Sequence, residues 1–163
     1  MSGYKHILVA ADLAADHGRL LPRAAEIAGK FGAKLTLLHV VDERDEGGDL
    51  RTPVAGVVTE PGSALSTQGG VTPEGPDVAH HKLERGAYAF LNDLARGLGL
   101  PAVDTEVIGS NSIWRAIVEV AVEKGADLIV VGSHRREGLD WIFGSTTDRL
   151  VRRAPCDLLA VRD

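Results

Sequence analysis

The stretch that decides the fold runs from Ala126 to Arg162 and reads ADLIVVGSHRREGLDWIFGSTTDRLVRRAPCDLLAVR. Its apolar beginning predicts a buried strand over Asp127 to Gly132, and a loop with two further glycines follows it. A helix led by Ser and Thr is expected from Ser145 to Arg153. Pro155 ends that helix before a last strand over Asp157 to Val161. A strand, a loop, a helix and a strand in this order indicate an α/β protein with a parallel sheet.

The loop between this strand and helix has the composition of a phosphate-binding site. Gly132 ends the strand, while Gly144, Ser145 and Thr146 lead into the helix. Glycine lets the main chain approach an anion closely, and the N–H groups at a helix N-terminus supply donors and a favourable dipole. Without a ligand, the same residues would form a turn and a helix N-cap, in which Ser145 contributes about 1 kcal/mol. The joint placement of the four residues favours phosphate binding.

The rest of the chain alternates short apolar runs with stretches of helical spacing. Three further strands are expected over His6 to Ala11, Lys34 to Val40 and Val103 to Ile108, which makes five in all. Three further helices are expected over Gly18 to Phe31, over Val78 to Leu98, and from Ser112 to Lys124. We expect Gly32 to end the first of these helices and the Ser112 hydroxyl to cap the third.

The segment from Glu43 to Asp77 breaks this alternation. It is crowded with Gly, Pro, Ser and Thr and contains only scattered apolar residues. Such a stretch in a compact domain is either a functional cover or a disordered insertion. We interpret it as a flexible insertion in one domain that spans residues 1–163.

Composition excludes several classes of protein. The chain has 163 residues, of which 44% are hydrophobic and 25% charged, as in globular domains. A net charge of −5 argues against a nucleic-acid scaffold, which needs clustered positive charge. Cys156 is the single cysteine, so no internal disulfide forms. No apolar run reaches the length of a membrane span, and no leader precedes His6, so a cytoplasmic location is expected.

Three stretches of the chain resemble the universal stress protein family. That family carries a Gly, two residues, a Gly, nine residues, and then Gly followed by Ser or Thr, directly after its fourth strand. Gly132 and the pair Gly144 and Ser145 match this motif, whereas Arg135 stands at the second glycine and the next spacer is one residue shorter. KHILVAAD, which ends at Asp12, resembles the family's first strand, and LTLLHVVD, which contains Val40, resembles its second.

The resemblance implies a Rossmann-like sheet of order 3-2-1-4-5 with an adenine nucleotide bound where the winding direction changes. It implies that Asp12 contacts the sugar or base side and that the main chain of Val40 contacts adenine. The candidate nucleotide-binding residues are Ala10, Asp12, Val40, Gly132, His134, Arg135, Gly144, Ser145 and Thr146. The implied ligand is ATP or AMP, with Mg²⁺ accompanying ATP. The implied assembly is a homodimer paired through Asp157 to Val161, with Leu159 and Val161 at the interface.

Several of these residues also have plain structural interpretations. Asp12 could be a surface carboxylate, and Val40 is a core residue in any version of this fold. Arg135 either blocks the space that a glycine leaves open or compensates the charge of an anion. His134 has no visible partner, so a solvent-facing ring is its default interpretation. We expect Trp114 and Trp141 to pack in the interior and Cys156 to be an inert packing residue.

The first functional hypothesis is a cytoplasmic, homodimeric stress-response factor that binds ATP or AMP at the loop from Gly132 to Thr146. The alternative is a protein of the universal stress protein A type, which acts through protein contacts without a nucleotide. An enzymatic role comes third. The chain has no G-x-S-x-G or H-E-x-x-H motif and no paired catalytic carboxylates at telling spacing, so slow ATP hydrolysis is the most we expect. No metal site is predicted, because no third ligand accompanies His80 and His81.

Overall fold

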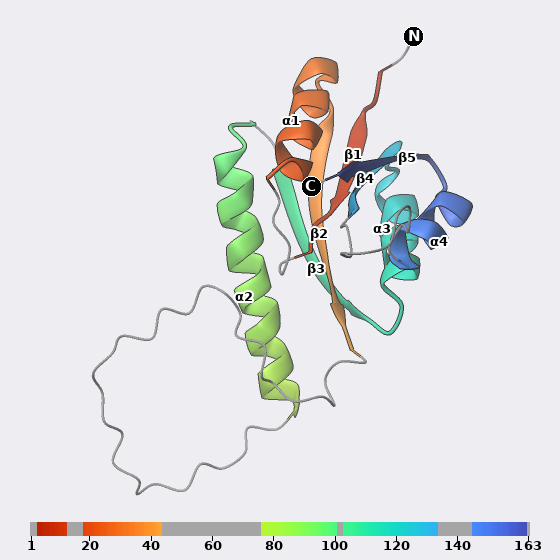
Figure 1. The fold of residues 1–163 in the computed structure, drawn as a ribbon. Helices are drawn as coiled ribbons and strands as arrows, with labels where there is room; N and C mark the ends of the chain where they lie inside the picture. The colour runs from red at the N-terminus through yellow and green to blue at the C-terminus, as the bar shows by residue number, and fades with distance from the viewer. Residues whose placement is uncertain (1–2, 13–17, 44–75, 101–102, 134–144, 163) are drawn as a thin grey trace, which may run out of the picture.

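The computed structural model describes residues 3–12, 18–43, 76–100, 103–133 and 145–162, with only the main chain for residues 76–83 (Figure 1). Its centre is a sheet of five parallel strands in the order β3-β2-β1-β4-β5. The strands are β1 (His6–Ala10), β2 (Lys34–Asp42), β3 (Val103–Ser110), β4 (Leu128–Ser133) and β5 (Asp157–Arg162). The predicted α/β class and the strand order 3-2-1-4-5 are therefore confirmed.

Helices cover both faces of this sheet. They are α1 (Leu20–Phe31), α2 (Pro76–Gly97), α3 (Ile113–Lys124) and α4 (Ser145–Arg153). Figure 1 shows α1 and α2 on one face and α3 and α4 on the other. Successive side chains of a strand point to opposite faces of the sheet. Ile7 and Val9 pack with α1 and α2, whereas Leu8 packs with α3 and α4. Covering on both faces explains why the strands read as nearly continuous apolar runs.

Glycines end two of the helices, and the first of them, Gly32, confirms the prediction from sequence. Gly32 follows α1 with φ of 64°, and its N–H donates to the carbonyl of Ala28. Gly125 follows α3 with φ of 63° in the same left-handed conformation. A residue with a β-carbon is strained at such angles, so these positions favour glycine.

The expected capping role of the Ser112 hydroxyl is wrong. Ser112 occupies the N-cap position of α3, but its side chain makes no capping hydrogen bond. The Ser112 carbonyl instead accepts hydrogen bonds from the N–H groups of Arg115 and Ala116, both at 3.1 Å. The Ser110 hydroxyl accepts the N–H of Ser112 at 3.1 Å, so the neighbouring serine closes this turn.

Some element boundaries differ from the predicted ones. The pairing of β2 with β3 continues to Asp42 and Ser110, two residues beyond the expected ends of both strands. Ladder hydrogen bonds hold these polar residues in the sheet although hydropathy does not reveal them. Helix α2 begins at Pro76, since proline is tolerated in a first helical turn, so the expected insertion ends earlier than Asp77. Residues 44–75 of that insertion lie outside the described residues.

None of the helices within the described ranges is long and apolar enough to cross a membrane.

Candidate functional site

The candidate site begins where β1 ends, because β1 lies between the two halves of the sheet. Ala10 is the last residue of β1 and pairs with Leu38 of β2 and with Val131 of β4. Helices connect to β1 and β4 on opposite faces, which makes the carboxyl end of these strands the topological switch point. Four predicted residues, Ala10, Asp12, Val40 and Gly132, are brought together there from three strands.

The main chain after β1 is held in place by β2. The N–H of Ala11 donates to the carbonyl of Leu38 at 2.8 Å. The carbonyl of Ala11 accepts a hydrogen bond from Nδ1 of His39, with 2.9 Å between the atoms. Ala11 is buried, and Asp12 directly after it is exposed. A fixed main chain therefore presents the Asp12 carboxylate at the surface.

Val40 lies on β2, two residues beyond the Leu38 that pairs with Ala10, and its side chain belongs to the core. Its side chain is 8% exposed and packs against the cluster under α3 and α4. The parallel ladder alternates the direction of main-chain groups, and since Leu38 bonds to β1, Val40 directs its N–H and carbonyl toward β1 as well. Val40 can therefore offer main-chain groups next to Asp12 while its side chain stays buried.

On the other side of β1, Gly132 and Ser133 end β4. Gly132 is half-buried and pairs with Val161 of β5. The hydroxyl of Ser133 donates to the Val161 carbonyl at 3.3 Å, which ties the ends of β4 and β5 together. The chain thus leaves the sheet at Gly132 and Ser133 in a defined position beside Ala10.

The N-terminus of α4 supplies the other predicted residues that the structure describes. Ser145 is exposed and Thr146 half-buried, and Thr147 is 5% exposed. Arg149 of α4 lies over the ring of Trp114 on α3, with 5.8 Å to the ring centroid, and Leu150 is fully buried. These contacts fix α4 on α3, so the first turn of α4 has a defined position.

Trp114 packs against the core as expected. It is half-buried, and its Nε1 atom is buried with no hydrogen-bond partner among the residues that the structure describes. Cys156 packs against the same cluster, and burial raises the pKa of its thiol, which fits an unreactive side chain.

The structure leaves part of the predicted site untested. His134, Arg135 and Gly144 lie outside the described residues, and so do Arg136 and Trp141. Of the predicted phosphate-binding loop, the structure therefore describes the two ends, with Gly132 in β4 and Ser145 at the start of α4.

Sequence reasoning missed His39. The sequence does contain a signal that could have pointed to this residue, because His39 is the one ionisable residue in the apolar run LTLLHVV. A histidine inside a strand that is buried on both faces needs a hydrogen-bond partner, and here the partner is the end of β1.

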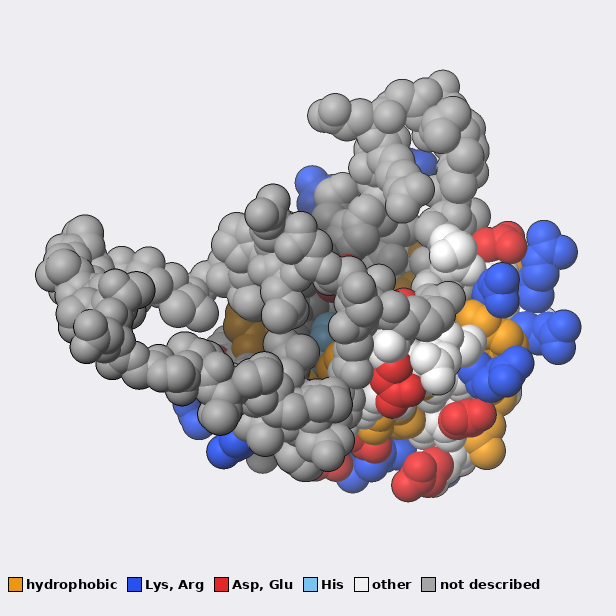
Figure 2. All heavy atoms as spheres, turned by 90° about the horizontal axis from the view of Figure 1, so that it is seen from below, with side chains coloured by type: hydrophobic (Ala, Val, Ile, Leu, Met, Phe, Trp, Pro, Cys, Tyr) orange, Lys and Arg blue, Asp and Glu red, His pale blue; other side chains and the backbone are white. Residues whose placement is uncertain are grey.

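Figure 2 looks onto the carboxyl end of the strands from below. Lys and Arg side chains gather at its right-hand edge, on the side of α3 and α4. On α4, Arg149, Arg152 and Arg153 are exposed, and Asp148 lies 3.6 Å from Arg152. Within the described ranges, no group of three His, Cys, Asp or Glu side chains is arranged to hold a metal ion.

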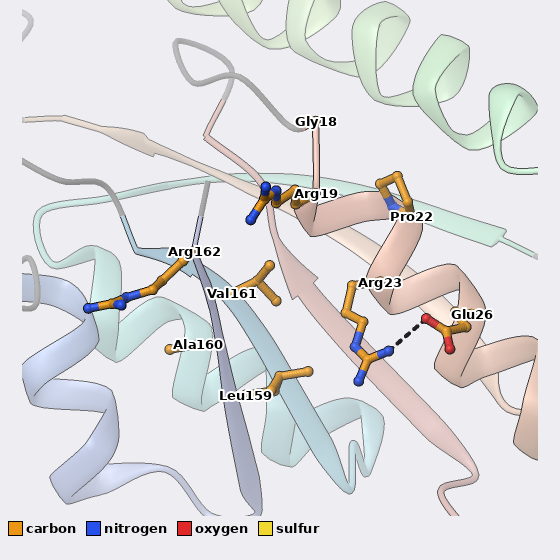
Figure 3. Close-up of a pocket in the computed structure, with 9 residues that line it drawn as sticks. All are labelled: Gly18, Arg19, Pro22, Arg23, Glu26, Leu159, Ala160, Val161 and Arg162. Carbon is orange, nitrogen blue, oxygen red and sulfur yellow. Dashed lines mark hydrogen bonds and ion pairs between the residues drawn. The ribbon is translucent and has the colours of Figure 1, made fainter.

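A concave surface lies between α1 and the edge strand β5 (Figure 3). It has a volume of about 570 Å³ and is lined by Arg19, Arg23 and Glu26 from the α1 side and by Leu159, Val161 and Arg162 from β5. Leu159 and Val161 point toward α1, whereas the Ala160 and Arg162 side chains point to the other face. Arg23 and Glu26 pair at 2.7 Å. The groove runs along the edge of the sheet, beside the switch point rather than in it.

The sequence match decides the family. The model of the universal stress protein family matches residues 3–162. The chain belongs to the universal stress protein family.

Individual relatives agree with this assignment along the whole chain. Universal stress protein A homolog 1 from Coxiella burnetii is 32% identical over 158 residues, which cover 97% of this chain and 96% of the relative. A solved universal stress protein in complex with cAMP matches with a TM-score of 0.60 and 24% identity, over 99% of this chain and 98% of its own. The universal stress protein from Archaeoglobus fulgidus in complex with dAMP gives a TM-score of 0.59 and 21% identity, over 96% and 97%. At these identities the two structures establish a shared fold.

Proposed function

We propose that this universal stress protein is a cytoplasmic stress-response factor that binds an adenine nucleotide at the carboxyl end of β1 and β4. The observation that carries the proposal is the convergence of Asp12, the Val40 main chain and Gly132 at the switch point of the sheet. Two proteins of the same fold were solved with cAMP and with dAMP, and both ligands are adenine nucleotides.

Each part of the site suits one part of such a ligand. The Asp12 carboxylate accepts hydrogen bonds from ribose hydroxyls, and the N–H and carbonyl of Val40 match the acceptor and amino donor on the edge of adenine. The main chain at Gly132 and the first turn of α4, with Ser145 and Thr146, supply donors for phosphate oxygens. Gly144, His134 and Arg135 complete this set on the sequence prediction alone. The ligand is ATP or AMP, and Mg²⁺ would enter with ATP.

The proposal assigns binding without fast turnover. The sequence has no paired catalytic carboxylates at telling spacing, which supports binding rather than turnover. Nucleotide occupancy would then act as a signal through the surface around the site.

A thermal-shift titration with ATP and AMP tests the proposal. A ligand that binds only the folded state and is present at a hundredfold its Kd raises the Tm of a chain of this size by about 5–10 °C. Asp12→Ala removes a charged acceptor, so the affinity should fall about ten- to a hundredfold. Asp93→Ala is the matched control, because Asp93 is an exposed carboxylate on α2 that pairs with Arg96. An unchanged Tm of the wild-type protein at millimolar nucleotide contradicts the proposal.

Two observations favour a second candidate, a stress protein that acts through protein contacts alone. The Coxiella burnetii relative carries the name universal stress protein A homolog, and Arg135 stands at a motif glycine. An Arg135→Gly variant that gains nucleotide binding absent from the wild type would support this candidate.

The proposed assembly is a homodimer through β5. This strand is at the edge of the sheet, so its outer main-chain groups have no strand beside them within the described residues. Leu159 and Val161 are only half-buried, and the groove of Figure 3 runs along them. Antiparallel pairing with the β5 strand of a second copy would cover this edge.

A further inference from the structure

The hydrogen bond from His39 departs from the regular pattern of the sheet. In a parallel ladder, the register of Ala10 with Leu38 is followed by a bond from the Val40 N–H to the Ala11 carbonyl. The ladder bond that precedes it is present, because the Ala11 N–H donates to the Leu38 carbonyl at 2.8 Å. The hydrogen bond found at the Ala11 carbonyl comes instead from the His39 ring, at 2.9 Å.

The direction of this bond is determined by its acceptor. A carbonyl oxygen only accepts, so Nδ1 of His39 carries the hydrogen. Both the neutral tautomer with Nδ1–H and the doubly protonated ring satisfy this requirement, so the contact persists in either charge state. The ring leaves β2 on the face of α1 and α2, the face on which Leu37 and Val41 pack.

Two consequences follow for the end of β1. The ring pins the carbonyl that immediately precedes Asp12, so the direction of the Asp12 carboxylate is coupled to His39. The ring also occupies one of the two lone-pair positions on the carbonyl that the ladder would assign to Val40, whose N–H points to the same side. Among the described residues, no backbone hydrogen bond joins the Val40 N–H to this carbonyl, so the N–H is available to another acceptor.

We propose that His39 is a positioning residue of the nucleotide site, which aims Asp12 at the sugar and reserves the Val40 N–H for the adenine edge. This inference rests on the proposed function. His39 itself touches no ligand in this arrangement and acts through the main chain of two neighbouring strands.

Two substitutions separate positioning from plain stability. His39→Asn keeps an N–H donor close to the place of Nδ1, whereas His39→Leu removes the donor and retains bulk. We expect His39→Leu to weaken ATP and AMP binding about tenfold and to reduce discrimination of ATP against GTP, as the loss of one oriented hydrogen bond predicts. His39→Asn should stay within about threefold of the wild type.

Thr36→Val is the matched control, because Thr36 lies on the same strand and is fully buried, but at the opposite end. It should lower the Tm without changing nucleotide selectivity. If His39→Leu and His39→Asn bind ATP as the wild type does, or if both weaken binding only in proportion to lost Tm, the positioning role is overturned.

A measurement without nucleotide tests the geometry. In the wild type the Val40 amide should exchange its hydrogen with solvent deuterium faster than the Leu38 amide. In His39→Leu it should slow, because the Val40 N–H takes the freed Ala11 carbonyl. Equal exchange in both proteins contradicts the inference. Wild-type protein that binds no nucleotide overturns the proposed function itself, a result distinct from normal binding that ignores His39.

Discussion

At the scale of single residues, the most consequential contacts link positions far apart in the sequence. His6, at the start of β1, lies between α3 and β2: its Nδ1 is 2.9 Å from the Lys124 carbonyl and its Nε2 is 2.8 Å from the Thr36 hydroxyl. The carbonyl only accepts, so Nδ1 donates to it, and in the neutral ring Nε2 accepts from Thr36. Since Thr36 is 0% and His6 8% exposed, water cannot replace these bonds.

We expect replacement of His6 alone to lower the free energy of unfolding more than replacement of both His6 and Thr36. His6→Leu leaves the Thr36 hydroxyl buried without its partner, and we expect it to lower the free energy of unfolding by about 1–3 kcal/mol. The double variant His6→Leu with Thr36→Val should recover part of this loss, because the buried Thr36 hydroxyl is then absent and only the Lys124 carbonyl still lacks its His6 donor. Urea denaturation of the four proteins in the cycle measures the coupling. Strictly additive losses would contradict the expectation.

A second residue-scale prediction concerns acid stability. A hydrogen bond from Lys34, at 2.7 Å, lowers the pKa of Asp104 from its ordinary value of 3.8. A carboxyl whose pKa is lower in the folded state contributes stability above its ordinary value, and this contribution is lost as the pH falls through the folded value. Asp104→Asn should therefore lose less stability than the wild type between about pH 5 and pH 2.

The measurement is the urea midpoint as a function of pH. Both side chains are about half exposed, so the effect will be small and reduced by salt. Asp93→Ala, which removes an exposed pair within α2, is the comparison variant. Parallel pH curves for Asp104→Asn and the wild type would exclude a contribution from Asp104.

At the scale of elements, β5 forms one edge of the sheet. Its register with β4 pairs Val130 with Leu159 and Val131 with Ala160. Even residues of β4 bond to β1, so its odd residues bond to β5, and the N–H of Leu159 faces β4. The N–H groups of Leu158 and Ala160 therefore face the open edge. Only these outward groups are available to another chain.

Ala160→Pro should separate the proposed dimer without unfolding the domain. It removes an outward N–H and leaves the ladder with β4 in place, since proline is tolerated on edge strands. Leu159→Pro would instead remove a donor to β4 and should destabilise the monomer as well. Sedimentation velocity at micromolar concentration reports the assembly, and circular dichroism reports the fold. A wild-type monomer, or an Ala160→Pro protein that still dimerises, would show that β5 is not the interface.

At the scale of the whole molecule, two apolar clusters lie on opposite faces of one sheet. The first joins α1 and α2 to the strands, and the second joins α3 and α4 to them. Because β1, β2 and β4 contribute to both clusters, the sheet couples the two helical layers into a single domain.

We predict that limited proteolysis cuts this domain first within residues 43–77. The composition of that segment has too little apolar surface to offset the entropy of ordering it. Trypsin should act at Arg44 and Arg51 before it cuts the core, and mass spectrometry of the first fragments identifies the sites. First cuts in α1 or α3, with Arg44 and Arg51 protected, would identify the segment as a packed element.

The sequence by itself determined the elements and their order in the chain. Five apolar runs, the helical spacing between them and Gly32 after α1 are local features, and local periodicity is enough to specify which face of each element is buried. The family resemblance supplied the strand order that the structure confirms. Asp12 and Val40 could be named in advance because the stretches that contain them resemble the family's first two strands, and Gly132 because it ends an apolar run before a loop with further glycines.

Only the tertiary structure decided which groups meet. The Ser112 cap, the extension of β2 and β3 to Asp42 and Ser110, and the contacts of His39 and His6 all depend on the register between strands. His6 and Lys124 are 118 residues apart, so no local pattern encodes their hydrogen bond. Burial on both faces of the sheet then makes each polar side chain depend on specific partners, and the tertiary structure provides them.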